Sequence, residues 1–206
     1  MRQKGLNTII KISLLSVMAF ILMFLEVPLP IFPSFLKIDL SDLPALFGAF
    51  ALGPAAGIGI ELLKNILHIV FKGTQTGFVG ELANFAVGAT LAVTAGTIYR
   101  ANKSKKTAIL GLVVGSIVMS VVAAVLNYTV LLPLYAKVYK APIDAFVAMG
   151  ATVNPNIKTV KDLVMWSIFP FNLLKGVVVS AVTVPLYKRV SPILHSEVIE
   201  DKRRTA

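Results

Sequence analysis

Four polar side chains recur on one face of a single apolar segment. Glu61, Lys64, Asn65 and His68 stand at offsets of 0, 3, 4 and 7, which stacks them on the same side of a helix. Because an ionisable group inside a bilayer is costly, each of them needs a partner or a function. Two interpretations stay open: Glu61 and Lys64 neutralise each other inside a bundle, or this face contacts a ligand. No metal site is expected here, because the other histidine, His195, lies in the C-terminal tail.

Three further apolar segments carry amides and charges at a similar expected depth. Glu81 and Asn84 lie within about 10 Å of the outer end of their helix. Asn127 comes a little over one turn before the outer end of the next helix, and Asn172 and Lys175 lie about 13–18 Å down the last. Glu81 alone has a simpler explanation, since an acid in a first turn is favoured by the helix dipole. Polar groups from four helices together predict a pocket that opens to the outside and binds a small solute.

The chemistry of this polar set suits a flat, polar-edged ligand. Asn172 and Lys175 are three residues apart and share a face, where they could hydrogen-bond a heteroaromatic carbonyl or hydroxyl groups. Aromatic residues near the same depth could stack on such a ring; they are Tyr128, Tyr135, Trp166, Phe169 and Phe171. For Trp166 and Tyr135 an interfacial aromatic belt is the favoured alternative.

Sequence motifs of common enzyme classes are missing. The chain has no G-x-x-x-x-G-K-[ST] loop for ATP, no H-E-x-x-H and no G-x-S-x-G. Cysteine is absent, so disulfides and thiolate chemistry are excluded. We therefore expect no enzymatic activity, no catalytic residues, no bound metal and no cofactor.

The composition is that of a membrane protein. Of 206 residues, 56% are hydrophobic and 15% charged, and the mean hydropathy is +0.82. A soluble domain of this size would need more polar surface to cover its core. The net charge of +10 does not predict nucleic-acid binding, because the basic residues gather at the two termini and in one short loop.

The hydropathy pattern predicts an all-α integral membrane protein with six transmembrane helices in a single domain. A span needs about 20 apolar residues. Gly53-Pro54 splits one long apolar stretch, because proline lacks an amide donor and favours the first turn of a helix. The second span is too short to cross unaided. The expected spans are about 9–27, 40–52, 54–71, 78–99, 108–132 and 163–187.

The basic residues also set the expected orientation. With both termini cytoplasmic, the cytoplasmic parts hold about twice as many lysines and arginines as the outer loops. The first helix is expected to be retained rather than cleaved as a signal, because no small-x-small site follows it. Residues 191–206 are expected to form a basic cytoplasmic tail. The long outer loops are the first and the fifth, Val27–Asp39 and Tyr135–Lys161, and the latter is the longest polar insertion.

Small residues recur at four-residue spacing, which lets helix backbones approach closely. They are Gly53 and Gly57; Gly88, Ala92 and Gly96; and Gly111 and Gly115. Tight packing within one bundle is the favoured interpretation over an oligomer contact.

Several runs of the sequence resemble the riboflavin-specific substrate-binding (S) subunits of energy-coupling factor (ECF) transporters. The resemblance covers roughly Leu14 to Tyr187. It rests on Lys37-Ile38-Asp39-Leu40-Ser41-Asp42-Leu43-Pro44, Gly53-Pro54-Ala55-Ala56-Gly57, Leu63-Lys64-Asn65, Ala83-Asn84-Phe85, Leu126-Asn127-Tyr128, Leu131-Leu132-Pro133-Leu134-Tyr135 and Pro170-Phe171-Asn172-Leu173-Leu174-Lys175-Gly176.

The resemblance implies a vitamin-binding membrane subunit without an ATPase of its own. It would join a transmembrane coupling protein and two cytoplasmic ATPase subunits in a bacterial plasma membrane. Ligand would be held near the outer surface, with Asn127, Asn172 and Lys175 as the polar contacts. Asn84 and the Asp39–Pro44 segment, which includes Asp42 and Leu43, come second. No role follows for Lys64 and Asn65.

One departure concerns docking to the coupling protein. These subunits often dock through an Ala-x-x-x-Ala motif on the first helix, whereas Ser13, Ser16 and Ala19 here supply small residues at three-residue spacing. The residues that dock are therefore not predicted. Two alternatives to a riboflavin subunit remain: an S subunit for another heteroaromatic vitamin, and a self-sufficient secondary carrier or channel.

Overall fold

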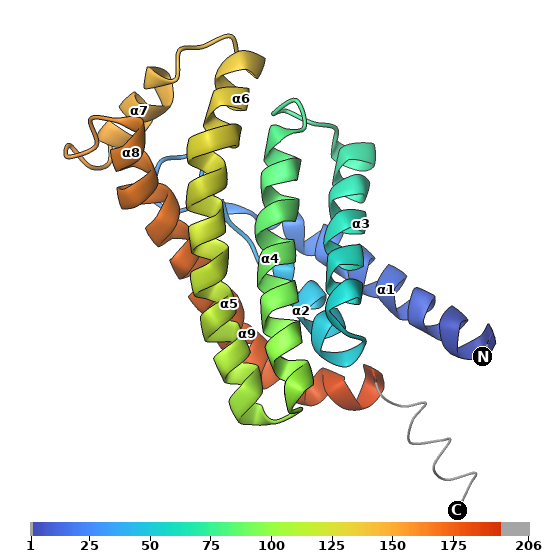
Figure 1. Cartoon of the computed structure of the whole chain (residues 1–206). Coiled ribbons are helices and arrows are strands. Elements are labelled where there is room, and N and C mark those ends of the chain that lie inside the picture. Colours follow the sequence, from blue (N-terminus) through green and yellow to red (C-terminus); the bar gives the residue numbers. More distant parts are fainter. Residues whose placement is uncertain (1, 195–206) are drawn as a thin grey trace, which may run out of the picture.

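The computed structural model describes residues 2–194, with side chains for residues 5–190. Helices dominate it; α3, α4 and α5 run roughly side by side, whereas α1 runs obliquely to them (Figure 1). In chain order the elements are α1 (Arg2–Met23), β1 (Val27–Pro28), β2 (Lys37–Ile38), α2 (Asp42–Ala51), α3 (Pro54–Lys72), α4 (Val79–Ala101), α5 (Lys105–Leu126), η1 (Asn127–Leu131), α6 (Leu132–Val138), α7 (Asp144–Ala151), α8 (Val160–Leu163), η2 (Val164–Ile168) and α9 (Phe169–Leu194).

Five helices of the described residues are long and apolar enough to cross a membrane. They lie within Gly5–Met23, Pro54–Lys72, Val79–Ala101, Lys105–Val138 and Val160–Val190. The helix α2 has 10 residues, so it is a shorter apolar helix, as the sequence indicated for the second segment. Five of the six expected spanning segments therefore correspond to long apolar helices of the described residues, and the sixth, α2, stays a prediction.

Several helix boundaries differ from the expected limits of the spans, and three of the differences lie near the predicted site residues or the first loop. The helix α1 ends at Met23, because Val27 pairs with Ile38 in the antiparallel ribbon of β1 and β2. The fifth apolar segment does not stop at residue 132; it continues through η1 and α6 to Val138. The last begins at Val160 rather than Leu163 and includes the π-helical η2.

The break between α2 and α3 lies where the sequence placed it. Gly53 has φ +110°, a conformation that costs glycine little and other residues more. Pro54 then opens α3, where its missing amide hydrogen is not needed. The two helices consequently pack against each other as a hairpin.

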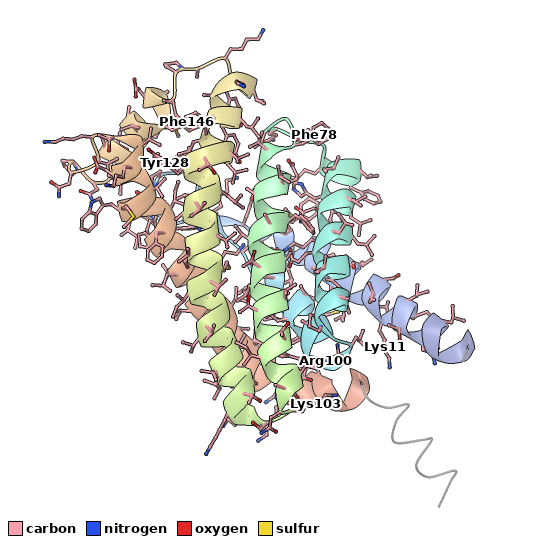
Figure 2. The ribbon with its side chains drawn as sticks, in the orientation of Figure 1. Lys11, Phe78, Arg100, Lys103, Tyr128 and Phe146 are labelled. Carbon is pink, nitrogen blue, oxygen red and sulfur yellow. The ribbon has the colours of Figure 1, made fainter. Side chains whose placement is uncertain are left out.

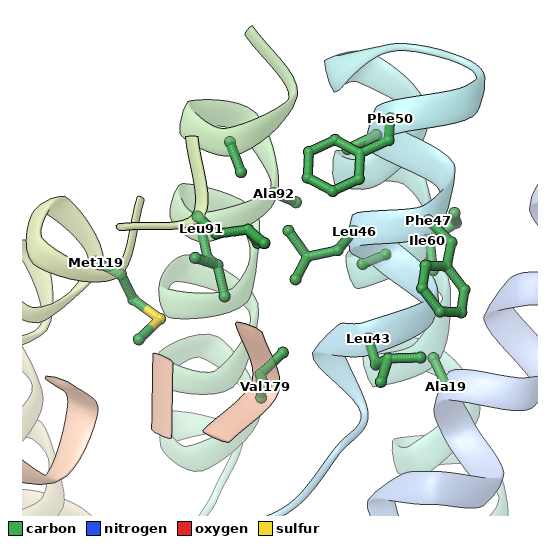
Figure 3. Packing of buried hydrophobic residues seen from close by; sticks show 14 of the residues in the cluster. Ala19, Leu43, Leu46, Phe47, Phe50, Ile60, Leu91, Ala92, Met119 and Val179 are labelled. Atoms are coloured by element: carbon green, nitrogen blue, oxygen red, sulfur yellow. The ribbon is translucent and has the colours of Figure 1, made fainter. Parts of the chain in front are cut away.

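The main core lies where α2 meets α1, α3, α4 and α9 (Figure 3). Leu46 of α2 and Leu91 of α4 are fully buried and face each other across this core. Gly57 lies so close to α2 and α4 that an added Cβ would stand 3.0 Å from the Cβ atoms of both Ala49 and Ala92. Some of the small-residue pattern thus serves packing within the bundle, as expected.

A second core lies at the opposite end of the bundle and corrects one expectation. The segment Tyr135–Lys161 is not simply a polar insertion, because it contains α7 and the last residues of α6. Phe146 and Val147 of α7 pack with Leu132, Ile157 and Leu163 in an apolar cluster. The helix Asp144–Ala151 buries one face. The polar residues and prolines on either side of it made the whole segment resemble a loop in the sequence.

Candidate functional site

A buried charge cluster lies between α2, α3 and α9. The ammonium of Lys64 lies 2.6 Å from Asp42 Oδ1 and 2.8 Å from Glu61 Oε2, and it donates a hydrogen bond to Ser41 Oγ at 2.9 Å. Lys175 Nζ lies 3.0 Å from Asp42 Oδ2 and 3.4 Å from Asp39 Oδ2. We call Asp39, Asp42, Glu61, Lys64 and Lys175 the buried charge cluster; each is at most 7% exposed.

Local sequence explains how the cluster forms. Asp39 Oδ1 accepts the backbone amide of Ser41 at 2.7 Å, a local turn of the type that aspartate favours. That turn leads into α2 and places Asp42 in its first turn, where the helix dipole favours a carboxylate. Gly88 of α4 leaves the space that the acids occupy: a Cβ there would overlap the Glu61 carboxylate and stand 2.9 Å from Asp42 Oδ1.

Asn65 extends the polar set from α3 towards α4. Its Nδ2 donates to Glu61 O at 2.8 Å and to Asn84 Oδ1 at 3.4 Å. Asn84 is therefore connected to the buried charge cluster through Asn65 and the backbone of Glu61. The expected helix face of Glu61, Lys64 and Asn65 is real, and the interpretation of a Glu61–Lys64 pair is confirmed, with Asp42 as an additional partner.

Glu81 belongs to a separate polar group at the α3–α4 turn. Its Oε2 accepts hydrogen bonds from Thr74 at 3.1 Å and Thr76 at 3.0 Å. Its Oε1 lies 3.6 Å from His68 Nδ1, which makes a charge pair when His68 is protonated. The simple explanation for Glu81, an acid in the first turn of a helix, agrees with this geometry.

Glu26 links the loop that follows α1 to the end of α3. Its Oε1 accepts hydrogen bonds from Lys37 at 2.8 Å and Lys72 at 3.3 Å. Partial burial raises the pKa of the Glu26 carboxyl, but the hydrogen bonds and charges of the two lysines outweigh that effect and hold this pKa below its usual value. The ionised carboxylate is therefore the form that holds β2 and the end of α3 together.

Asn127 lies in a π-helical turn and Asn172 lies one turn after another, in the two longest helical segments. Asn127 begins η1, and Asn172 follows η2 by four residues. Each amide donates to the carbonyl four residues earlier at 2.8 Å, Asn127 to Ala123 and Asn172 to Ile168. The segments η1 and η2 contact each other. Single π turns within α-helices occur often at functional sites, and this signal was not available from the sequence.

The remaining predicted site residues lie in different environments. Phe171 is buried and meets Phe32 of the first loop edge to face, with ring centroids 5.3 Å apart. Leu43 is buried in the main core beside Ala19 (Figure 3). Tyr128 is 53% exposed and lies on the outside of the bundle (Figure 2), so the expectation that it stacks on a ligand has no geometric support.

A cavity of about 360 Å³ lies between the first loop and α7, on the side of the first loop where Phe32 meets Phe171. It is lined by Pro28, Leu29, Pro30, Phe32, Ser34, Met149, Thr152 and Val153. None of the nine predicted site residues lines it, but Phe32 joins it to Phe171. Phe32 was not predicted from the sequence, because a single phenylalanine in a loop gives no periodic signal.

The sequence also did not predict the ion pair between Asp39 and Lys175. Asp39 and Lys175 are 136 residues apart, and only the fold brings α9 against the start of α2. Charge provided a partial signal: a lysine near the middle of an apolar span predicts a buried acid nearby. It could not say which acid.

Three comparisons with known proteins agree with one another. A family model described as "ECF transporter, substrate-specific component" matches residues 7–187. The chain is 40% identical over 186 residues to "Riboflavin transporter RibU" of Staphylococcus aureus (strain TCH60), covering 90% of this chain and 91% of that protein. It is 32% identical over 190 residues to "Riboflavin transporter FmnP" of Bacillus subtilis (strain 168), covering 92% and 94%.

A solved structure is similar over almost the whole fold. It is titled "Structure and mechanism of the S component of a bacterial ECF transporter" and superposes with a TM-score of 0.72 at 38% identity. The match covers 94% of this chain and 99% of that one. The fold and the sequence thus indicate the same family.

Proposed function

This chain belongs to the family of ECF transporter substrate-specific components, and on that premise we propose that it binds riboflavin at the outer side of a membrane for uptake. The observation that carries the proposal is the 40% identity to a riboflavin transporter over 90% of the chain. A second relative named for the same vitamin matches as completely. The family model matches residues 7–187, a range that includes every predicted site residue.

The ligand site we propose lies in the outer half, between the first loop, η1 and the η2–α9 segment. Phe32 and Phe171 would border the isoalloxazine ring, and the amides of Asn127 and Asn172 would bond its polar edge or the ribityl chain. The cavity beside Phe32 would supply the entrance. Its volume of about 360 Å³ lies at the lower end of the range typical of ligand pockets.

Lys175 would take part as an exchangeable partner. Its 3.4 Å contact with Asp39 is the longest ion pair of the buried charge cluster, so a ligand oxygen could replace Asp39 while Asp42 keeps the lysine charge paired. Asp39 follows β2 directly, so this exchange would couple ligand capture to the first loop. Asn84 would be a weaker candidate for a ligand contact than Asn127, Asn172 and Lys175. Asp42, Leu43 and Glu81 would support the site without touching the vitamin.

The wider assembly is also part of the proposal. Both termini would be cytoplasmic, with α2 as a short sixth segment, in the plasma membrane of a bacterium. A transmembrane coupling protein and two ATPase subunits would supply the energy, which agrees with the missing phosphate-binding loop. The docking residues on α1 stay unassigned.

Absorbance provides the direct test of ligand identity. Protein purified from riboflavin-supplied cells should be yellow and should keep flavin absorbance after desalting. Ligand-free protein should bind added riboflavin with quenching of flavin fluorescence. Protein that stays colourless and ignores riboflavin, but binds another heteroaromatic vitamin, would replace riboflavin by that vitamin.

Substitutions of the two amides test the place of the site. Asn127→Ala and Asn172→Ala should each weaken riboflavin binding by about 1–3 kcal/mol, because each removes a buried hydrogen bond to the ligand. Isothermal titration would measure it. Asn156→Ala, in the exposed part of the fifth loop, is the matched control and should leave affinity unchanged. Wild-type affinity in both test variants would exclude the proposed pocket.

A further inference from the structure

A second cavity, of about 290 Å³, lies at the end of the bundle opposite the proposed riboflavin site. It is lined by the α4–α5 turn, the last part of α9 and Phe50 of α2. Apolar walls come from Ile109 and Leu112 of α5 and Val184 of α9. Lys103, Lys105 and Lys188 are exposed and complete the lining. The cavity thus combines an apolar interior with a basic rim.

The charge around this cavity is one-sided. Within residues 5–190, no acidic side chain lines it and no ion pair engages its three lysines. Arg100 and Lys103 lie together at this end in Figure 2, away from Phe78 and Phe146. The amino end of α5, at Lys105, adds partial positive charge. A bound group with negative charge would therefore be attracted here.

The apolar wall continues from the cavity onto the outer surface of α5. Ile109 lines the cavity and is still 42% exposed, and its neighbours Leu110 and Val113 are more than half exposed. In a membrane-spanning helix this surface faces hydrocarbon. A ligand can therefore have one part among the lysines and another part in the bilayer.

We propose that this cavity binds an anionic phospholipid, with its phosphate among Lys103, Lys105 and Lys188 and the start of an acyl chain against Ile109, Leu112 and Val184. Basic pockets between transmembrane helices on the cytoplasmic side are suited to such headgroups. A free phosphate would leave the apolar walls unused, and a zwitterionic lipid would leave the cationic rim unbalanced. A second copy of this end would be repelled by its own positive charge.

Native mass spectrometry of the full-length protein in mixed micelles tests the proposal. Wild type should retain phosphatidylglycerol in preference to phosphatidylcholine. Lys105→Gln/Lys188→Gln should reduce phosphatidylglycerol retention roughly 25-fold, since a basic residue at an anionic lipid surface contributes about fivefold. Lys137→Gln/Lys158→Gln makes the same change in charge at the other end of the bundle and should leave retention unchanged.

A second variant tests the role of the cavity volume independently of the charge of the three lysines. Ala108 lines the cavity, and Ala108→Phe would fill it while keeping all three lysines. Phosphatidylglycerol with a photoreactive acyl chain should cross-link to α5 and α9 in wild type, and much less in Ala108→Phe. Thermal unfolding and riboflavin binding, followed in the same samples, show whether each variant is folded.

Three results would overturn the lipid site. They are equal phosphatidylglycerol retention by wild type and the double lysine variant, cross-links that avoid α5 and α9, and displacement of the lipid by millimolar inorganic phosphate, which would indicate a simple anion site. Wild-type protein that binds this lipid as expected but no riboflavin would contradict the proposed function alone.

Discussion

Asp42 is the residue that holds the buried charge cluster together. It is the only acid of the cluster in contact with both lysines, at 2.6 Å from Lys64 and 3.0 Å from Lys175. Glu61 contacts Lys64 alone within the cluster. Three acids face two lysines, so the cluster has one carboxyl group more than its lysines can balance. Since unbalanced buried charge is costly, the acids are not equivalent.

The two acids should respond differently to neutral substitution. Asp42→Asn should lower the free energy of unfolding by about 3–5 kcal/mol, because both lysines lose their shared partner. Glu61→Gln should cost much less, because it removes the excess charge and keeps the side-chain volume. Thermal unfolding in detergent would compare them. Equal losses in the two variants would contradict the central role of Asp42.

At the scale of elements, close helix contact is what makes room for buried charge. The helix α4 approaches α3 closely enough at Gly88 that the Glu61 carboxylate occupies the place of a side chain. Helices α3 and α4 also come close to α2: a Cβ added at Gly57 or at Gly96 would stand 3.0 Å from the Cβ of Ala49. Small residues on these helices therefore serve both packing and the site.

Two glycine substitutions test this packing. Gly88→Ala should destabilise the protein by about 1–3 kcal/mol, because its new methyl group overlaps Glu61. Gly59→Ala is the matched control on α3, where an added Cβ meets Ile12 at an ordinary 3.9 Å. It should be neutral or stabilising by up to about 1 kcal/mol through helix propensity. The midpoint of thermal unfolding reports both; an unaffected Gly88→Ala variant would disprove the steric argument.

The first loop should loosen in acid. Because the pKa of Glu26 is lowered in the folded protein, its contacts with Lys37 and Lys72 stabilise the fold above the unfolded pKa of about 4.3. That stabilisation is lost as the pH falls through the folded value. Hydrogen exchange of residues 27–38 should be slower in wild type than in Glu26→Gln at pH 7, and the difference should vanish at low pH. A pH-independent difference would exclude this carboxylate as the cause.

At the scale of the whole molecule, the buried charged side chains are not spread evenly along the bundle. The buried charge cluster, the Glu81–His68 group and the two π segments all lie towards the end of the bundle that carries α7. The other end has the basic rim of the second cavity. This asymmetry is consistent with our proposal that riboflavin binds at one end of the bundle and that a partner protein drives its transport.

Reconstitution tests whether the chain needs that partner. Liposomes that contain this chain alone should bind riboflavin without accumulating or leaking it, because no energy-supplying subunit is present. Flux should start when a coupling protein and its two ATPases are added with ATP. Sustained riboflavin flux through the chain by itself would favour the alternative of a self-sufficient carrier or channel.

Sequence alone determined the features that depend on neighbours along the chain. Apolar runs predicted the long helices, Gly53-Pro54 predicted the break before α3, and the offsets of Glu61, Lys64 and Asn65 predicted one helix face. These follow from local backbone chemistry and helical periodicity. The resemblance to the family extended that information to a ligand and a set of candidate contacts.

Tertiary structure decided which of those side chains meet. It paired Asp39 and Lys175 across 136 residues, made Asp42 the shared partner of two lysines, and left Tyr128 exposed on the outside of its helix. It also folded α7 out of a segment that looked like a polar loop. Contacts between distant residues depend on how helices pack and twist against each other, and the two π turns changed that register where no sequence periodicity could indicate it.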